Sequence, residues 1–223
     1  MFMHVEIAYF GHASFRLKGR VKTVVTDPYG DQVGKYPRDV EADIITVSHD
    51  HFDHNAVDKI KGLPAGKPGH PFVINGPGEY EIGGVSVVGI PTWHDEKAGG
   101  ERGLNTVYVI EMEGLRIAHL GDLGHKLSDQ QLEEIGAIDV VFVPVGGKYT
   151  IDAKTAKEVV GQVDPWVIIP MHYKMADFGL KDVDLIDDFL KEMGKPEIVP
   201  VAKYSIAADR LPEDMQLVVL EKK

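Results

Sequence analysis

The first half of the chain consists mainly of short hydrophobic stretches. In some of them hydrophobic residues alternate with polar ones, and in others they follow one another without interruption. Bounded by turn residues, such stretches are typical of β-strands. They predict strands over residues 5–9, 14–17, 21–26, 44–47, 72–74, 85–90, 106–111 and 115–119. The last two strands are expected to pair as a hairpin through Glu113 and Gly114.

Helical signals are concentrated in the second half of the chain. Ser128 and Gln131 have the spacing of a capping box, which opens a helix over 129–135 that ends at Gly136. By the same criteria of caps and apolar stripes, further helices are expected over 56–61, after Asp152 and over 183–193.

Two almost fully apolar segments, 140–145 and 167–171, lie between the helices and predict strands that are buried on both faces. The whole pattern indicates two strand-rich layers covered on the outside by helices, which is an α/β architecture. A chain of this length supports one substantial core. We therefore expect a single domain over residues 1–223.

Composition narrows the class of protein. The chain has 24 Lys and Arg against 35 Asp and Glu, a formal charge of −11, which disfavours a protein that coats a nucleic-acid duplex. It contains no Cys, so a bound metal has to use His and carboxylate ligands. Neither a signal-peptide pattern nor an apolar run of membrane-spanning length is present, and we expect a cytoplasmic protein without a membrane partner.

The candidate chemistry is concentrated in residues 48–55, directly after a predicted strand. His49 and His51 are two positions apart, so both side chains point the same way in an extended chain. Asp53 and His54 point apart unless the chain turns, and the short helix expected next supplies a turn. Two neighbouring metal sites are indicated. Imidazole and carboxylate ligands suit zinc, manganese or iron better than calcium.

Three further candidate ligands come just after other predicted strands: His94, Asp122 and His172. Loops that follow neighbouring strands meet at one edge of a layered fold, so these side chains are expected to complete the metal sites. Two polar, glycine-rich loops, 62–71 and 95–103, are expected at the rim of the site.

These residues resemble the pattern of the metallo-β-lactamase superfamily. The resemblance is carried by the run His49-x-His51-x-Asp53-His54, followed by His94, Asp122 and His172. Two further segments are similar to the subgroup that includes L-ascorbate-6-phosphate lactonase and related Zn-dependent hydrolases: Gly11-His12-Ala13-Ser14-Phe15 and Pro170-Met171-His172-Tyr173. The motifs are more specific for the superfamily than for a substrate.

The resemblance implies a four-layer αββα sandwich, in agreement with the predicted layers, and two divalent metal ions, zinc first and manganese or iron as alternatives. It implies that the first ion is bound by His49, His51 and His94, and the second by Asp53, His54 and His172, with Asp122 bridging. The implied activity is a dinuclear metal-dependent hydrolase in which a metal-bridging hydroxide attacks a small ester, lactone or phosphodiester. Asp53 and His119 are the expected catalytic residues.

Rival functions are a nuclease acting on RNA or DNA and a non-catalytic metal-binding protein of the same fold. A nuclease is disfavoured because the segment between Asp122 and His172 is too short for the large inserted domain of resembling RNA-processing members. A non-catalytic role is disfavoured because decayed members usually lose ligands. Position 51 is His, where oxygen-reducing di-iron members have Glu, which disfavours a redox role.

Other residues are candidates for contacting the substrate or a metal ligand: His12, Lys148 and Tyr149. Ordinary packing or a plain turn is the alternative for each of them, and Arg102 and Lys174 are expected to be solvated. The metal charges make a locally positive site possible in an acidic protein. We expect a small-molecule substrate, with anionic molecules among the candidates, while the sequence does not indicate an oligomeric state.

Overall fold

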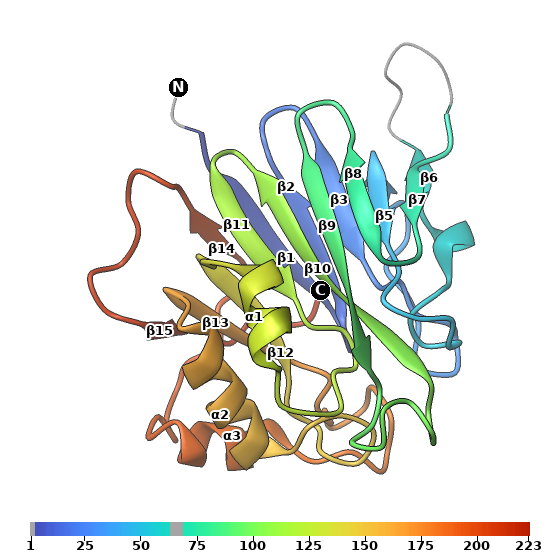
Figure 1. The fold of residues 1–223 in the computed structure, drawn as a ribbon. Helices are drawn as coiled ribbons and strands as arrows, with labels where there is room; N and C mark the ends of the chain where they lie inside the picture. The colour runs from blue at the N-terminus through green and yellow to red at the C-terminus, as the bar shows by residue number, and fades with distance from the viewer. Residues whose placement is uncertain (1–2, 63–68) are drawn as a thin grey trace.

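Two β-sheets lie face to face in the computed structural model, which describes residues 3–62 and 69–223 (Figure 1). The first sheet has the strand order β14-β1-β2-β3-β5-β7. In that order the strands are Tyr204–Ile206, Val5–Gly11, Ser14–Lys18, Thr23–Thr26, Ile44–Thr46 and Phe72–Ile74. Beside it, β4 (Glu41–Ala42) pairs with β6 (Lys61–Gly62).

The second sheet has the order β15-β13-β12-β11-β10-β9-β8. In that order the strands are Gln216–Leu217, Val167–Met171, Val140–Pro144, Leu115–His119, Leu104–Met112, Ser86–Trp93 and Gly78–Glu81. The predicted hairpin between β10 and β11 is confirmed, since Met112 pairs with Leu115.

The main hydrophobic core lies between the sheets and extends under the helices. Along the first sheet, Val24 and Ile44 belong to this core, whereas their neighbours Val25 and Ile45 pack in a second cluster on the outer face. The alternation follows from the two-residue period of side-chain direction in a strand. The outer cluster is completed by residues of the irregular segment after β3, among them Tyr29.

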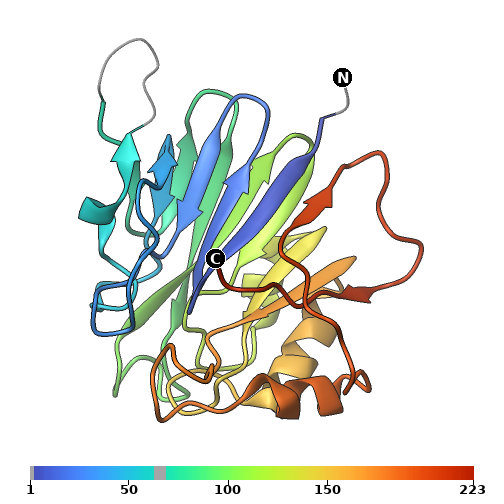
Figure 2. The same ribbon diagram turned by 180° about the vertical axis from the view of Figure 1, so that it is seen from behind.

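The helices cover the second sheet. They are α1 (Asp129–Ile135), α2 (Ala153–Val163) and α3 (Ile186–Glu192). Helix α2 connects the parallel strands β12 and β13, and α3 packs on α2. Figure 2 shows the outer face of the first sheet, which no α-helix crosses in the described part of the chain.

The predicted α/β fold with two strand layers is confirmed, with fewer helices than a symmetric four-layer arrangement implies. The capping box of Ser128 and Gln131 is present as predicted, and the Asp152 side chain caps α2 by accepting a hydrogen bond from the Thr155 N–H. These caps depend on neighbours along the chain, which is why the sequence is sufficient to predict them.

Two predicted helices differ from the structure. The helix expected over 56–61 is one 3-10 turn, Val57–Lys59, because the Lys61 N–H pairs with Val40 O and draws the chain into β6. The helix expected from residue 183 begins at Ile186, because the Asp184 N–H donates to Gly146 O instead of continuing a helical turn. None of the described helices has the length and apolar character needed to cross a membrane.

Candidate metal centre

The strands that precede the candidate ligands end at the same edge of the sandwich. Strands β3 and β5 run parallel, as do β11, β12 and β13, and the antiparallel partners between them bring β1 and β9 into the same direction. Their C-terminal ends are followed by His12, Asp27, the run His49–His54, His94, Asp122 and His172. Strand direction therefore gathers residues that are far apart in the sequence.

Asp122 occupies the centre of this cluster. Its Oδ2 lies 3.2 Å from Nε2 of His94, 3.3 Å from Nε2 of His54 and 3.3 Å from Nε2 of His172. Nε2 of His49 lies 3.9 Å away. All five side chains are almost completely removed from solvent. One buried carboxylate oxygen is thus surrounded by four imidazole nitrogens.

The donor atoms fall into groups whose members lie within 4.8 Å of one another. One group is His49, His51 and His94, a second is His12, Asp53, His54 and His172, and a third joins His49, His54 and Asp122. The first two groups contain the two ligand sets implied by the sequence resemblance, and the third places Asp122 between them. The one addition is His12. That these side chains bind metal stays a prediction.

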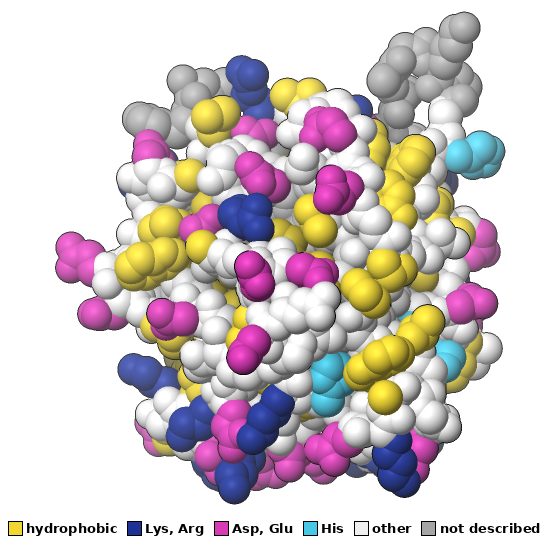
Figure 3. All heavy atoms as spheres, viewed as in Figure 1, with side chains coloured by type: hydrophobic (Ala, Val, Ile, Leu, Met, Phe, Trp, Pro, Cys, Tyr) yellow, Lys and Arg dark blue, Asp and Glu magenta, His cyan; other side chains and the backbone are white. Residues whose placement is uncertain are grey.

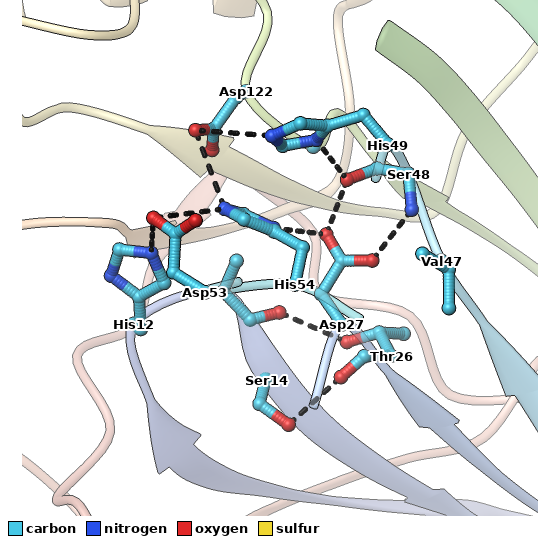
Figure 4. Close-up of polar contacts among 12 residues, drawn as sticks. His12, Ser14, Thr26, Asp27, Val47, Ser48, His49, Asp53, His54 and Asp122 are labelled. Carbon is cyan, nitrogen blue, oxygen red and sulfur yellow. Dashed lines mark hydrogen bonds and ion pairs between the residues drawn. The ribbon is translucent and has the colours of Figure 1, made fainter. Parts of the chain in front are cut away.

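Asp27 was not singled out from the sequence, and it orients two of the candidate ligands (Figure 4). Its carboxylate accepts hydrogen bonds from the Ser48 N–H at 2.8 Å, the Ser48 hydroxyl at 2.6 Å and Nδ1 of His54 at 2.8 Å. Because the Ser48 proton is directed at Asp27, Oγ of Ser48 accepts from Nδ1 of His49, 3.0 Å away. Both imidazoles therefore turn Nε2 toward the cluster. The sequence offered one signal for this role, an acidic residue directly after the strand predicted over 21–26. The dipeptide Asp27-Pro28 is also common in turns, so the signal was ambiguous.

Unpartnered buried atoms test whether the cluster fits a metal. Six of the eight buried side-chain atoms without a hydrogen-bond partner in the described chain belong to it: Nε2 of His49 and His54, Nδ1 of His94, Oδ1 of Asp122 and both ring nitrogens of His172. The contacts of His54 and His172 with Asp122, at 3.3 Å, do not have hydrogen-bond geometry. Native proteins rarely leave such atoms unpaired unless an ion or water satisfies them. Unprotonated imidazole nitrogens and carboxylates are the usual ligands of zinc. The residues present fit a divalent cation.

The electrostatics of the cluster favour positive charge at its centre. Burial alone would lower the pKa of His54, but Asp122, Asp27 and Asp53 raise that pKa well above its ordinary value. Burial and the neighbouring His54 lower the pKa of His49 to about 2, so its ring stays neutral. In a protein without metal, a proton on His54 supplies charge that a cation would supply in the loaded protein.

His12 lies in the turn after β1 and contacts the loop after β13. Its Nε2 is 3.1 Å from Oδ2 of Asp53, and its carbonyl oxygen accepts hydrogen bonds from the His172 N–H at 2.7 Å and from the Tyr9 hydroxyl at 2.9 Å. Both His12 and His172 adopt positive φ angles, 58° and 55°, which side-chain-bearing residues rarely occupy. Such strained backbone is concentrated at functional sites.

Three other residues predicted from the sequence, His119, Lys148 and Tyr149, differ in how far they are buried. His119 is fully buried, with Nε2 2.8 Å from Ala13 O, and Nδ1 accepts from the Gly121 N–H at 3.2 Å. These contacts hold the turn that carries Asp122, and the catalytic role of His119 stays a prediction. The Lys148 ammonium and the Tyr149 hydroxyl each lie 2.6 Å from Oδ2 of Asp182.

A cavity of about 330 Å³ opens over the cluster. It is lined by His51, Phe52, Asp53, His94, Arg102, Asp122, Tyr149 and Leu180. The predicted rim loop 95–103 contributes Arg102 to this lining. The other predicted rim loop, 62–71, has residues 63–68 outside the described part of the chain.

Comparison with known proteins agrees with the fold. A sequence profile for the beta-lactamase superfamily domain matches residues 6–172, and the chain belongs to this superfamily. The chain is 32% identical over 190 residues to a UPF0173 metal-dependent hydrolase of Thermococcus onnurineus, covering 76% of this chain and 84% of that relative. The resemblance found in the sequence is confirmed.

Solved structures extend the comparison. A crystal structure from Thermotoga maritima, assigned to the Zn-dependent hydrolases of the metallo-beta-lactamase superfamily, is 40% identical and has a TM-score of 0.76, with 97% of this chain and 98% of that chain covered. A metallo hydrolase of Ignicoccus hospitalis has a TM-score of 0.66 at 19% identity, covering 91% of this chain and 98% of that chain. At that identity the likeness concerns the fold alone.

Proposed function

We propose that the protein is a dinuclear metal-dependent hydrolase of small molecules, with zinc as its ions. The observation that carries the proposal is the arrangement of two donor groups on either side of Asp122, in which buried ring nitrogens of His49, His54, His94 and His172 have no hydrogen-bond partner in the described chain. The similar proteins from Thermococcus onnurineus and Thermotoga maritima are named as metal-dependent and Zn-dependent hydrolases, which supports it.

In this proposal the first ion is held by His49, His51 and His94, and the second by Asp53, His54 and His172, with Asp122 between them. Divalent ions so held would lower the pKa of a water molecule and polarise the bond under attack. No Ser or Cys nucleophile is needed. The substrate is proposed to be an ester, a lactone or a phosphodiester.

Asp53 is the proposed proton carrier. Its side chain lines the cavity, and its Oδ2 is oriented by the hydrogen bond with Nε2 of His12. Burial raises the pKa of Asp53, but His54 and the hydrogen bond from His12 outweigh this and hold the pKa below its usual value. The carboxylate is therefore ionised at neutral pH and can accept the proton of the attacking water and return it to the leaving group.

The cavity over the cluster limits the size of the substrate. Its volume, about 330 Å³, lies near the lower end of the range for small-molecule pockets. Phe52, Tyr149 and Leu180 form walls with apolar surface around the polar floor. Such a cavity accepts a molecule of modest size with an apolar portion, and it disfavours a polymeric substrate.

Elemental analysis and a hydrolysis screen test the proposal together. We expect about two zinc ions per chain and hydrolysis of at least one member of a panel of lactones, thioesters and phosphodiesters. His51→Ala and Asp53→Ala should each lower kcat/KM roughly 100-fold or more. Asp50→Ala is the matched control, since Asp50 is exposed and bonded to Asn55. Fewer than one ion per chain would contradict the dinuclear site. Bound zinc without hydrolysis would favour the non-catalytic metal-binding alternative, and full activity in both cluster variants would exclude the assigned roles.

A further inference from the structure

The cavity over the metal centre contains one basic side chain of the Lys or Arg type. Among the described residues that line it, Arg102 alone carries a guanidinium or ammonium group. Phe52 and Leu180 lie in the same lining. Apolar walls reduce the local dielectric screening, so a guanidinium there attracts an anion more strongly than an exposed one does.

Arg102 also borders the cavities on either side. One of about 260 Å³ lies toward the start of α2 and is lined by Lys148 and Thr155, and another of about 400 Å³ lies over His49 and Leu104. A molecule that extends from the metal centre into either neighbouring cavity therefore meets this side chain. Arg102 is therefore placed to contact a substrate that occupies any of the three cavities.

The loop is built so that Arg102 is held in place. The buried carboxylate of Asp95 accepts four backbone hydrogen bonds: from Lys97 at 2.8 Å, Gly99 at 3.1 Å, Glu101 at 3.0 Å and Arg102 at 2.8 Å. Hydrogen bonds to a charged acceptor are stronger than those between neutral groups. The backbone that carries Arg102 is thereby fixed relative to His94, the residue directly before Asp95.

The guanidinium itself retains unused donors. Its nearest acid is Glu101, whose Oε2 is 3.8 Å from Nη1, too far for a hydrogen bond, while the other oxygen of Glu101 lies 2.5 Å from the Lys97 ammonium. The guanidinium carbon lies 5.9 Å from the centre of the Tyr149 ring, and the Tyr149 hydroxyl donates to Asp182. A cation–π contact of this kind attracts a guanidinium toward an aromatic ring without consuming its N–H groups.

The surface around the site has no uniform sign that could attract anions by itself. Figure 3 shows Lys and Arg side chains mixed with Asp and Glu along the lower edge of this face, where the loops of the site lie. Away from the metal ligands, this surface offers an anion no general attraction, so recognition of an anionic group there depends on a particular side chain. We propose that Arg102 binds an anionic group of the substrate, a carboxylate or a phosphoryl group, while the bond to be hydrolysed lies over the metal centre.

A planar fork of N–H donors matches the paired oxygens of either group. The proposal rests on the proposed function in one respect, namely that the substrate binds in this cavity. Within that function it names a substrate class: a small ester, lactone or phosphodiester that carries a second, anionic group at its far end. Tyr149 and Asp95 are positioning residues in this arrangement, because they act through Arg102.

Calorimetric binding of unreactive acids to the zinc-loaded protein tests the proposal without requiring turnover. The probes are malonate, succinate and glutarate, which have a second carboxylate at increasing distance, and butyrate, which has none. One carboxylate of any probe can contact the metals, so the preference for a dicarboxylate over butyrate isolates the second group. A parallel arm with 3-phosphonopropionate distinguishes a phosphoryl group from a carboxylate.

We expect the wild-type protein to bind at least one doubly anionic probe roughly 10- to 100-fold more tightly than butyrate. Arg102→Met should reduce this preference to within about twofold, with unchanged zinc content and thermal stability, and Arg102→Lys should restore part of it. Arg20→Met is the matched control, because Arg20 is exposed in the turn after β2 at the opposite end of the sheet.

The proposal is overturned if the wild-type protein shows no such preference, if Arg102→Met keeps it, or if Arg20→Met loses it equally. These outcomes are independent of the hydrolysis screen. If the wild-type protein hydrolyses no substrate, but its preference for doubly anionic probes disappears in Arg102→Met, the proposed function is contradicted and the anion site is supported. The reverse pattern supports the hydrolase and contradicts the anion site.

Discussion

Oδ2 of Asp27 lies 2.8 Å from Nδ1 of His54, and both side chains are completely buried. The same carboxylate binds the backbone N–H and the hydroxyl of Ser48, which in turn accepts from His49. One acid outside the candidate ligand sets therefore fixes the ring orientation of two candidate ligands. Partners of this kind, hydrogen-bonded to the far nitrogen of a ligating imidazole, contribute strongly to metal affinity.

The first prediction concerns Asp27→Asn. An amide cannot accept all three hydrogen bonds without directing an N–H at one of the donors, so the rings of His54 and His49 lose their fixed orientation. We expect metal affinity to fall roughly 10- to 100-fold, measured by competition with a chelator. Asp31→Asn is the control, because Asp31 is an exposed acid paired with Lys59. Unchanged affinity in Asp27→Asn would show that the rings hold their orientation without it.

The second prediction separates a structural from a catalytic His119. A Gln at this position can still donate to Ala13 O, so we expect His119→Gln to keep the pH–rate profile of the wild type and most of its rate. His119→Ala removes one of the two hydrogen bonds to that carbonyl, which also accepts from the Thr26 hydroxyl, and opens a cavity, which should cost about 2–4 kcal/mol of unfolding free energy in urea titrations. If His119→Gln is inactive while zinc content and stability are retained, His119 takes part in the reaction.

The third prediction uses two glycines. A Cβ on Gly124 would lie 2.4 Å from both the carbonyl carbon of His94 and the backbone nitrogen of Asp95. Gly124→Ala should therefore displace the His94 backbone, reduce zinc occupancy and lower the unfolding free energy by about 1–3 kcal/mol. At Gly161, inside α2, such a Cβ would have no described atom within 4 Å apart from the chain neighbours and the nearby backbone of the same helix. Gly161→Ala should raise the stability by about 0.5–1 kcal/mol and leave zinc binding unchanged.

The opposite ranking of these two variants in thermal melts would contradict the packing described around His94. Zinc analysis on the same samples distinguishes a local effect at the site from a general loss of folding. A general loss would lower the melting temperature of the metal-free protein as much as that of the loaded protein.

The fourth prediction concerns pH. Burial alone would raise the pKa of Asp95, but four backbone N–H donors hold it at about 2, below the value of 3.8 expected for an unperturbed side chain. A carboxyl group whose pKa is lower in the folded state stabilises the fold above its unfolded pKa, and this contribution disappears as pH falls through the folded value. The relevant window is therefore pH 4 to 2.

Thermal melts of the metal-free protein and of Asp95→Asn provide the measurement. The wild type should melt at a higher temperature than the variant by a constant margin from pH 7 to about 5, and the margin should narrow as the pH falls below about 4. Asp129→Asn, a change at an exposed acid in α1, should show no such narrowing. A margin that is absent at pH 7 would contradict the stabilising role of the Asp95 hydrogen bonds.

Local features of this protein could be predicted from the chain alone. The strand Phe72–Ile74, the hairpin between β10 and β11 and the capping box at Ser128 depend on residues that are neighbours along the chain, and all are present. The short strands β14 and β15 were not predicted. Unlike Phe72–Ile74, they contain no uninterrupted apolar run, and they exist because β1 and β13 offer edges to pair with.

The candidate site divides in the same way. Most residues proposed to bind metal could be selected from the sequence, because closely spaced His and Asp after a strand have few other uses, and the later His and Asp also follow strands. Three relationships became evident only in the folded chain: Asp27 orients His54, 27 positions away, His12 contacts Asp53, and Arg102 lines the cavity. These contacts depend on strand order and direction, which bring distant loops to one edge and which no local pattern of residues encodes.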